Sequence, residues 1–372
     1  MEITITKHDL LRELSAVQSV VERKTTIPIL SNVLFEAAAN HSLAITGTDL
    51  DQSMRTSCPA RVKTPGVAAI PARKLYDYVK LLGDCDITLK LLENHWIQLR
   101  AGRSNTKMIS MAASSFPKIP VFPATALRLP AAAMRSMVSK AMCAVSFEES
   151  RYMLRGALLI IKSNSMAMVS TDGHRLAFVD VTTPIEGVSV EQRILVPRKA
   201  LTELESLLST SENEHLEFAN DEATLFFRFA GRVLTSRKLT GQFPNFEAVL
   251  PKEHTIEATV RTRELTQALS RVVQFADDRS QTVKFRLENN ELKITSSSTE
   301  LGESEETLDT AYTHTPLTIC FNANYVRDFL KAIADTETFS IKFKDSNSAG
   351  EMAPCQAMPD TKYRMIIMPV RG

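Results

Sequence analysis

Apolar residues recur at helical spacing near the start of each third of the chain. The intervals of three, four and seven residues place each set on one side of a helix, which is typical of an amphipathic helix. The positions are Leu10, Leu14, Val17 and Val21 in the first third, Met134, Met137, Val138, Ala141, Met142 and Val145 in the second, and Leu265, Leu269, Val272, Val273 and Ala276 in the third. The pattern therefore predicts one similar helix in each third.

A second helix is predicted about halfway through each third. Its apolar positions are Leu75, Val79 and Leu82, then Leu201, Leu204, Leu207 and Leu208, then Val326, Phe329, Leu330 and Ile333. The first two of these helices begin with similar residues, Pro71-Ala72-Arg73-Lys74 and Pro197-Arg198-Lys199-Ala200, and the prolines are 126 residues apart. Proline is favourable in the first helical turn.

Other motif pairs have nearly the same period. Thr48-Asp49 and Thr171-Asp172 are 123 residues apart, and Phe116-Pro117 and Phe243-Pro244 are 127 apart. Since three periods fill the 372 residues, we expect three similar domains at 1–126, 127–253 and 254–372. Strands are predicted between the helices, at 42–46, 87–91, 224–229 and 291–295, from alternating or β-branched residues. We therefore expect an α+β fold in which each domain packs two helices on antiparallel sheets.

The composition is that of a folded, soluble protein, with 44% apolar and 23% charged residues, 12 glycines and 16 prolines. The net charge of +1 gives no reason to expect a polycationic surface, and the three domains carry +4, 0 and −3. A gradient of this kind suits head-to-tail association, although ordinary scatter in composition produces the same gradient.

Nothing in the sequence indicates secretion or a membrane. The five cysteines form no CxxC pair, which argues against a zinc ribbon or a disulfide framework and favours a reducing cytosol. The first seven residues lack the features of a signal peptide, and no run approaches the roughly 20 apolar residues of a membrane span. We expect a cytoplasmic protein.

Nine short motifs follow one another along the chain. They are Thr26-Ile27-Pro28-Ile29-Leu30-Ser31-Asn32, Thr46-Gly47-Thr48-Asp49-Leu50, Pro71-Ala72-Arg73-Lys74, Gly102-Arg103-Ser104, Arg151-Tyr152-Met153-Leu154-Arg155-Gly156, Thr171-Asp172-Gly173-His174-Arg175-Leu176, Val196-Pro197-Arg198-Lys199, Phe243-Pro244 and Met368-Pro369-Val370-Arg371. In this order the set resembles the bacterial DNA sliding clamp family, the beta subunit of DNA polymerase III. The resemblance spans the full length.

The resemblance implies three DNA-clamp domains per chain and a head-to-tail dimeric ring, with helices lining the hole and sheets outside. It also implies a processivity factor that encircles double-stranded DNA, associates with the nucleoid and has no cofactor or chemistry of its own. Attraction to phosphates does not depend on base sequence, so a sliding protein should present lysine and arginine without reading bases.

The resemblance assigns six DNA-facing residues: Lys24, Arg73, Arg103, Tyr152, Arg198 and Lys199. A basic pair at a helix start is usually a solvated surface feature, and the helix dipole disfavours it. Because this unfavourable choice occurs in two repeats, we favour a phosphate-facing role. Met153 stands where family members often have a second aromatic residue.

The resemblance also implies a hydrophobic pocket between the second and third domains. The pocket accepts short linear motifs of DNA polymerase III alpha and other polymerases, of the clamp-loader delta subunit and of mismatch-repair proteins. Its residues would be Leu154, Thr171, Gly173, His174, Arg175, Leu176, Pro244, Val249, Ile366, Met368, Pro369, Val370 and Arg371. As an alternative, the apolar members are plain core and His174 stabilises a turn. Ala248 departs from the family, where arginine can precede the valine.

For the homodimer, the resemblance points to Lys74 and Met108 of the first domain. Their counterparts in the third domain would be Gln274, Phe275, Glu300 and Glu303, within an acidic run that continues to Glu305 and Glu306. Phe275 is equally compatible with an intramolecular core position.

Two other classes of protein are disfavoured: an enzyme and a monomeric, sequence-specific DNA-binding protein. Asp49-Leu50-Asp51 and Asp172-Gly173-His174 are compatible with metal or acid–base chemistry, but such motifs are short and frequent, and no HExxH, Walker, GxGxxG or GxSxG sequence is present. The Thr-Asp pair is instead predicted to form a turn in which aspartate caps backbone amides. A sequence-specific DNA-binding monomer lacks support, because no helix-turn-helix, zinc-finger or leucine-zipper pattern occurs.

Overall fold

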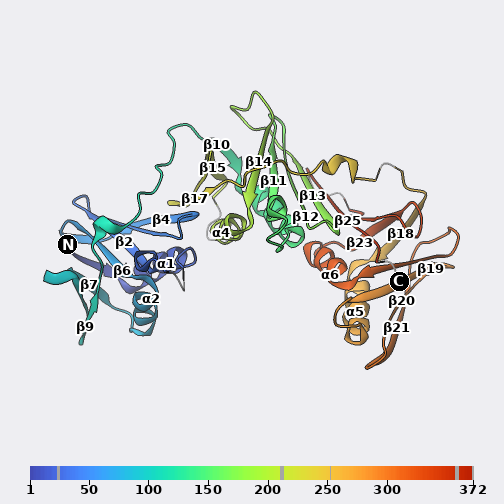
Figure 1. The fold of residues 1–372 in the computed structure, drawn as a ribbon, viewed down its shortest axis with the longest axis horizontal. Coiled ribbons are helices and arrows are strands. Elements are labelled where there is room, and N and C mark those ends of the chain that lie inside the picture. The colour runs from blue at the N-terminus through green and yellow to red at the C-terminus, as the bar shows by residue number, and fades with distance from the viewer. Residues whose placement is uncertain (23–25, 210–212, 252, 357–359, 371–372) are drawn as a thin grey trace. The chain divides into compact units, whose positions relative to one another are not determined.

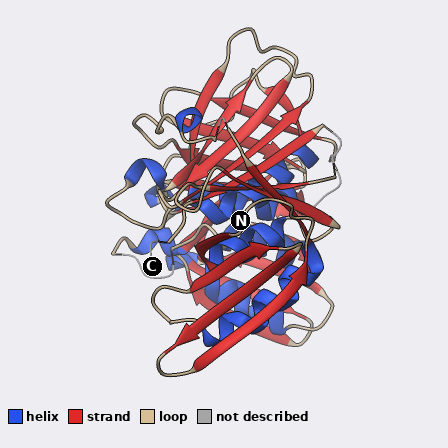
Figure 2. Ribbon diagram, turned by 90° about the vertical axis from the view of Figure 1, so that its right-hand side faces the viewer, coloured by secondary structure: helices blue, strands red, loops and turns tan. Residues whose placement is uncertain are grey.

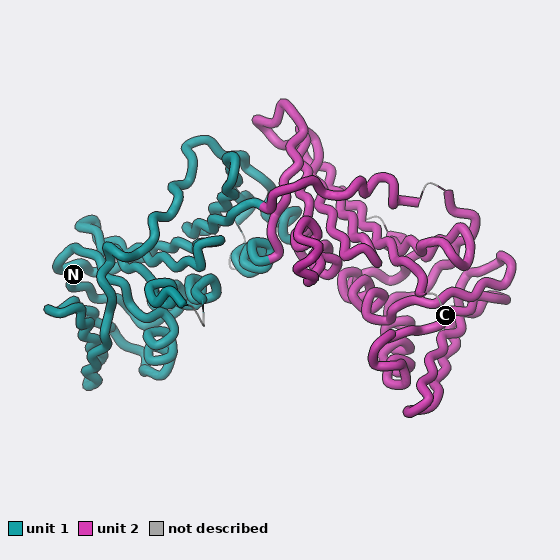
Figure 3. Tube along the Cα trace, viewed as in Figure 1, with its two compact units in different colours: residues 1–135, 199–238 teal, residues 136–198, 239–372 magenta. Residues whose placement is uncertain are grey.

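The chain folds into two compact units, each built from helices and antiparallel sheets (Figures 2 and 3). The computed structural model describes residues 1–22, 26–209, 213–251, 253–356 and 360–370. Unit 1 comprises residues 1–135 and 199–238, and unit 2 comprises residues 136–198 and 239–372. The expected α+β class, with helices and antiparallel sheets, is confirmed.

Unit 1 contains two sheets, with strand orders β5-β1-β7-β8-β9 and β10-β15-β16-β17-β4-β3-β2-β6 (Figure 1). The strands of the first are β5 (Arg61–Thr64), β1 (Glu2–Thr6), β7 (Asp86–Leu91), β8 (Trp96–Ala101) and β9 (Ser104–Ile109). Those of the second are β10 (Leu127–Pro130), β15 (His215–Asn220), β16 (Thr224–Phe229), β17 (Arg232–Arg237), β4 (Gln52–Pro59), β3 (Ser42–Thr48), β2 (Asn32–Ala38) and β6 (Gly66–Pro71). The helices are α1 (Lys7–Gln18), α2 (Ala72–Leu81) and, from residue 199, α4 (Arg198–Leu208), with short 3-10 helices at Pro28–Ser31, Glu93–His95 and Ala113–Ser115.

Unit 2 also contains two sheets, with strand orders β14-β11-β12-β13-β25-β24-β23-β18 and β21-β20-β19-β22. The strands of the first are β14 (Gln192–Pro197), β11 (Gly156–Ile161), β12 (Ser165–Thr171), β13 (Arg175–Thr182), β25 (Thr361–Ile367), β24 (Gly350–Pro354), β23 (Thr338–Phe343) and β18 (Ile256–Arg261). Those of the second are β21 (Gly302–Asp309), β20 (Glu291–Ser298), β19 (Thr282–Glu288) and β22 (Leu317–Asn322). The helices are α5 (Thr262–Val272), α6 (Ala323–Ala332) and, from residue 136, α3 (Ala131–Ala141), with 3-10 helices at Met142–Ala144, Tyr152–Leu154, Phe246–Ala248 and Val273–Phe275.

The apolar stripes of the six helices face the core, as their spacing predicted. Leu10, Leu14 and Val17 of α1 are fully buried, and the corresponding positions of the other helices are also buried. Five of the six predicted stripes extend past the end of their helix. The residues beyond the helix ends are Val21 after α1, Leu82 after α2, Met142 and Val145 after α3, Val273 and Ala276 after α5, and Ile333 after α6.

Glycine allows α1 to pack closely on β3. A Cβ atom on Gly47 would lie 2.6 Å from Val17 Cγ1 and 2.9 Å from Val21 Cγ2. These distances are shorter than any real contact between carbon atoms, so a side chain at this position would push the helix away.

Each eight-stranded sheet joins two of the repeats. In unit 1, β4 of the first repeat pairs with β17 of the second, and Gln52 lies opposite Ser236. In unit 2, β13 of the second repeat pairs with β25 of the third, and Arg175 lies opposite Ile367. The corresponding strands β9 and β21 are edge strands of their sheets within the part of the chain that the structure describes.

Candidate peptide pocket and nucleic-acid interface

The turn between β12 and β13 is closed by Asp172. Its Oδ1 atom accepts hydrogen bonds from the backbone N–H groups two and three residues further along, both at 3.0 Å. Asp49 makes the same two hydrogen bonds in the first repeat, at 3.0 and 2.8 Å. The predicted turn with a capping aspartate is therefore confirmed in both repeats.

Several predicted pocket residues meet at this turn. Gly173 at its tip has a φ of +90°, and Arg151 Nη1 occupies the place that a Cβ would take, so both conformation and space favour glycine. The His174 side chain is exposed, while its carbonyl accepts a hydrogen bond from the N–H of Met368 at 2.9 Å. This hydrogen bond joins the turn to the segment that follows β25.

An apolar cluster lies beside the turn. Leu176 and Ile366 are cross-strand partners on β13 and β25, and they are 2% and 1% exposed. The cluster also contains Leu158, Ile160, Ala167, Val169, Leu195, Phe243 and Phe246, with Leu154, Phe178, Leu239, Leu250 and Ala349 packed against it. Sequence reasoning anticipated only Leu154, Leu176 and Ile366 of this set; Phe243 was recognised as part of a motif but not as a wall of the pocket, and Phe246 was not singled out.

The edge of the cluster is accessible. Pro244 is exposed, Val249 is 47% exposed and Met368 is 45% exposed, while Pro369 and Val370 are half-buried. A buried apolar floor with a partly exposed apolar rim suits the recognition of apolar side chains. The predicted member Arg371 lies outside the described residues.

Arg175 supports the turn from the helix side rather than lining an open surface. Its side chain is 10% exposed, and its guanidinium lies 2.6 Å from Asp328 Oδ2 and 3.0 Å from Asp172 Oδ2. It also stacks on Tyr325, 4.3 Å from the ring centre, and its carbonyl accepts a hydrogen bond from Thr171 Oγ1 at 2.6 Å. Burial alone would lower the pKa of Arg175, but the carboxylates raise it, so the group stays charged.

Three of the predicted DNA-facing residues belong to unit 1. Arg73 and Arg103 are exposed, and Arg73 lies 3.7 Å from Asp77 on the same helix. Lys199 donates a hydrogen bond to the buried Asp49 at 2.8 Å, which raises its pKa. Arg73 and Arg103 therefore present charge to solvent, whereas Lys199 also ties α4 to the turn of the first repeat. Lys24 lies outside the described residues.

The other two lie in unit 2, next to an aromatic ring that sequence reasoning missed. Phe147 is 76% exposed, and the Arg198 guanidinium lies 3.5 Å from its ring centre. Arg198 Nη1 also donates to the carbonyl of Val145 at 2.7 Å, and Tyr152 nearby in sequence is 47% exposed. In the sequence, the signal for an exposed ring was a single phenylalanine between polar residues.

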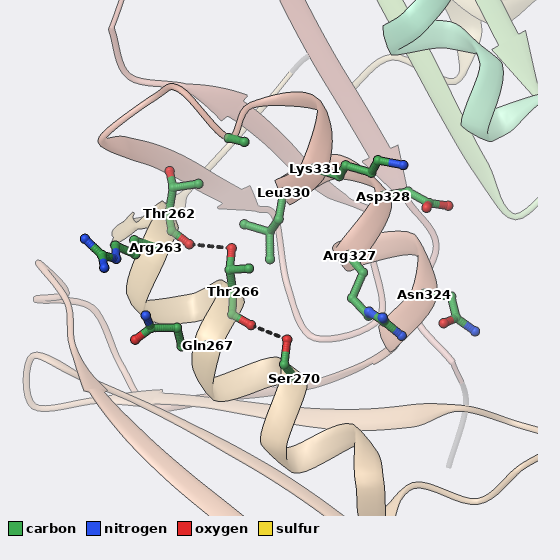
Figure 4. A pocket seen from close by; sticks show the side chains of 11 residues that line it. Thr262, Arg263, Thr266, Gln267, Ser270, Asn324, Arg327, Asp328, Leu330 and Lys331 are labelled. Carbon is green, nitrogen blue, oxygen red and sulfur yellow. Dashed lines mark hydrogen bonds between the residues drawn. The ribbon is translucent and has the colours of Figure 1, made fainter.

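A basic groove that sequence reasoning also missed runs between α5 and α6 (Figure 4). Its volume is about 790 Å³, and its lining includes Arg263, Arg327 and Lys331 as cations and Asp328 as the one carboxylate. Thr262, Thr266, Gln267, Ser270 and Asn324 also line it. The sequence signal for this groove was the polar face of α6, where Arg327 and Lys331 are four positions apart and share one side of the helix. Cations beside hydroxyl and amide groups suit a phosphate backbone.

Of the residues predicted for the dimer contact, Met108 lies on β9 and Glu303 on β21, Gln274 and Phe275 lie in a 3-10 helix that contacts β21, and Lys74 lies on α2. Lys74, Gln274, Glu300 and Glu303 are exposed, and Phe275 is half-buried. Glu305 and Glu306 pair within the unit, with Lys293 at 2.8 Å and Arg271 at 2.6 Å.

Met108 turns inward on β9 and is 9% exposed, whereas its neighbour Ile109 is 64% exposed. Leu301, which precedes β21, is 55% exposed. Sequence reasoning did not single out Ile109 or Leu301, because their exposure depends on the strand register.

No site for metal chemistry was found where the structure describes the chain. In those ranges no group of three or more His, Cys, Asp or Glu side chains is placed to hold a metal ion. In the same ranges, no helix is both long and apolar enough to cross a membrane. All five cysteines are unpaired.

Comparison with known proteins connects this geometry to one family. Three family models cover the chain in succession: the N-terminal domain of the DNA polymerase III beta subunit at 1–120, its central domain at 128–245 and its C-terminal domain at 247–371. The beta sliding clamp of Pseudomonas putida is 32% identical over 385 residues, with all of both chains covered.

Solved structures agree with this result. The DNA polymerase III subunit beta of Pseudomonas aeruginosa superposes with a TM-score of 0.92 at 30% identity and full coverage of both chains. A second structure of a sliding clamp from that organism, bound to griselimycin, has a TM-score of 0.93 at 30% identity and also full coverage. The chain therefore belongs to the DNA polymerase III beta-subunit family, the bacterial sliding clamps, which are processivity factors and not enzymes.

Proposed function

We propose that two copies of this chain close head to tail around duplex DNA and hold replication and repair proteins there through the apolar pocket of unit 2. The repeats at 1–126, 127–253 and 254–372 would supply three similar segments per subunit. The partners would be DNA polymerase III alpha and other polymerases, the clamp-loader delta subunit and mismatch-repair proteins, and the protein would act in the cytoplasm, on the nucleoid. The observation that carries the proposal is that β9 and β21 each have one edge without a partner strand among the described residues.

The two junctions inside the chain provide a template for the junction between copies. In unit 1 the strand after the Thr48-Asp49 turn pairs with β17, and in unit 2 the strand after the Thr171-Asp172 turn pairs with β25. The third repeat has the same kind of turn at Ser298, whose Oγ accepts a hydrogen bond from the N–H of Glu300 at 3.3 Å. The strand after this turn is β21, and the first-repeat equivalent of β17 and β25 is β9. Pairing of β21 with β9 of a second copy would therefore repeat the internal junctions.

The template also sets the register of this pairing. Gln52 opposite Ser236 and Arg175 opposite Ile367 correspond to Gly302 opposite Met108. The next pair on one side is then Glu303 with Lys107, and on the other side Leu301 with Ile109.

Both flanking pairs are chemically complementary. Lys107 and Glu303 are exposed, and neither forms an ion pair within the described part of the chain. Leu301 and Ile109 are two of the most exposed apolar side chains, at 55% and 64%. One register thus joins opposite charges and covers two apolar groups, which supports the head-to-tail seam.

Gly302 also leaves room for a side chain of the second copy on the helix side of the sheet. Its missing side chain leaves Phe275 Cδ1 4.0 Å from the place of a Cβ. A methionine opposite the glycine would reach Phe275, which supports the proposed contact of Met108 with that ring. Lys74, Gln274 and Glu300 would surround it with polar groups.

The basic groups on the helices support binding of DNA without sequence readout. The groove between α5 and α6 supplies Arg263, Arg327 and Lys331, and the predicted DNA-facing set supplies Lys24, Arg73, Arg103, Tyr152, Arg198 and Lys199. Guanidinium and ammonium groups attract phosphates irrespective of sequence, so the affinity should fall steeply with salt.

The apolar cluster of unit 2 supports the peptide site. Its proposed residues are Leu154, Thr171, Gly173, His174, Arg175, Leu176, Pro244, Val249, Ile366, Met368, Pro369, Val370 and Arg371. The P. aeruginosa clamp that is 30% identical binds griselimycin, which is consistent with an apolar ligand site in this family. Replacement of the exposed Met368 by Asp should abolish binding of that compound to this chain while leaving DNA retention intact.

Retention on circular DNA tests the ring. The protein should stay on a nicked circular plasmid through gel filtration in about 0.5 M salt and leave when the plasmid is linearised, because phosphate attraction alone is weak at that ionic strength. Equal loss from both forms of DNA would refute encirclement, although the pocket would remain a testable site.

A further inference from the structure

An ion-pair network around the largely buried Arg175 lies behind the apolar cluster of unit 2, with the Asp328 side chain 39% exposed. Arg175 points to the helix side of β13, because its partners Asp328 and Tyr325 belong to α6. Leu176, the next residue, belongs to the apolar cluster on the opposite face, since successive side chains alternate across a strand. The backbone that presents Leu176 is therefore held by a side chain fixed from behind.

The guanidinium has a partner on every side. Nη1 donates to Asp328 at 2.6 Å, Nε donates to Asp172 at 3.0 Å, and Nη2 donates to the carbonyl of Cys143. Asp172 in turn caps the tip of the turn that carries His174. A change at Asp328 is thus transmitted to the turn through a single buried group.

Unit 1 has the same framework without the ion pair. Gln52 stands where Arg175 stands after the turn, and Glu203 is the sixth residue of α4, as Asp328 is the sixth residue of α6. The Oε1 atom of Gln52 has no hydrogen-bond partner among the described residues, and Glu203 accepts instead from Ser19 at 2.6 Å.

The two junctions also differ on the other face of the sheet, the one opposite Arg175 and Gln52. Leu176 and Ile366 form the apolar pair in unit 2, whereas the equivalent pair in unit 1 is Ser53 and Thr235. The ion pair therefore accompanies the apolar surface, and a junction of this kind forms without it. Its presence in unit 2 calls for a role beyond joining two repeats.

We propose that Asp328 is a positioning residue for the peptide site: through Arg175 it fixes the turn that carries His174 and Leu176, without touching the ligand. This inference rests on the proposed peptide pocket. In Figure 4, Arg327 and Asp328 leave α6 in different directions. Both line the basic groove, and the Asp328 carboxylate also reaches Arg175, which supports the turn between β12 and β13. Loss of the carboxylate leaves Asp172 as the one charged partner of Arg175 given above, beside the carbonyl of Cys143, and the turn can then follow the guanidinium to a new position.

Binding of griselimycin by isothermal titration calorimetry tests this role. Asp328→Asn should raise the dissociation constant roughly tenfold, which lies within the usual scale for coupling within one ion-pair network. Asp328→Glu should recover part of the loss. Asp335→Asn removes the same charge close to the end of α6 and should leave the affinity unchanged, which controls for the change in net charge.

Three outcomes decide the question. A wild-type affinity in folded Asp328→Asn, even with a lowered melting temperature, would overturn the positioning role, because a merely structural pair changes stability and not the affinity of the folded state. If this variant does not fold, Arg175→Lys keeps the charge but loses the fork of hydrogen bonds, and unchanged affinity there would overturn the role equally. Failure of the wild type to bind griselimycin would instead refute the proposed pocket.

Discussion

Reversal of charge at the proposed seam should weaken the dimer, and a second reversal should restore it. Lys107 on β9 and Glu303 on β21 are both exposed in the single chain, so their pairing has the modest value of a surface ion pair, about 0.5 kcal/mol. Lys107→Glu replaces this attraction with a like-charge pair that costs a similar amount, for a change of about 1 kcal/mol per seam.

The symmetry of the dimer doubles the effect. A closed head-to-tail dimer contains two identical seams, so one substitution changes the free energy of dimerisation by about 2 kcal/mol, or roughly 30-fold in Kd. The Kd is measured by sedimentation velocity over a dilution series. The shift should shrink in 1 M salt, where the Debye length falls to about 3 Å.

The double variant Lys107→Glu with Glu303→Lys provides the decisive comparison. Opposite charges face each other again, so the Kd should return to within a few-fold of the wild type. If Glu303→Lys fails to rescue Lys107→Glu, the two residues do not face each other and the register is wrong. Glu288→Lys is a matched control that should leave the Kd unchanged, because Glu288 pairs with Arg286 inside its own unit and lies on β19, away from the edge strand β21.

Three further predictions concern single features of the fold. Burial alone would raise the pKa of Glu13, but hydrogen bonds from Arg232 and Arg12 hold it below its ordinary 4.5, so wild-type stability should fall as the pH drops below about 4.5. Arg232→Met should cost about 3 kcal/mol at pH 7 in urea unfolding and make that pH slope smaller, since only Arg12 then stabilises the Glu13 carboxylate, and an unchanged slope would contradict the assignment. Replacing Arg327 and Lys331 by Gln should lower the slope of log K for duplex DNA against log salt by about two; an unchanged slope would exclude the α5–α6 groove from DNA contact. Gly47→Ala should lower the melting temperature, because its Cβ would lie 2.6 Å from a methyl group of α1, and a wild-type melting curve would show that the helix can move.

Local chemistry explains which parts of the structure the sequence predicted. The helices followed from apolar spacing, since burial of one face fixes both the element and its orientation. The turn at Asp172 followed from a side chain that bonds to its own backbone, which requires no knowledge of the rest of the fold.

Long-range contacts explain what remained hidden. The burial of Arg175 depends on Asp328, 153 residues further along the chain, and no local pattern marks that pair. The exposure of Ile109 follows from the register of β9 at the sheet edge, and a shift of one residue would have exposed Met108 instead. Phe147 could not be recognised as an exposed ring until the structure placed Arg198 against it.

A covalently closed ring tests the central claim most directly. Cysteines in place of Ile109 and Leu301 should form a disulfide across each seam, because directly opposite residues of paired strands have the Cα separation that a disulfide requires. After oxidation, this variant should stay on a nicked circle in 1 M salt and with denaturant, and should leave on reduction or linearisation. The two single-cysteine variants control for the native cysteines, of which Cys355 is exposed. Absence of a crosslinked dimer, or release of the crosslinked dimer from the intact circle, would contradict a head-to-tail ring joined by β9 and β21.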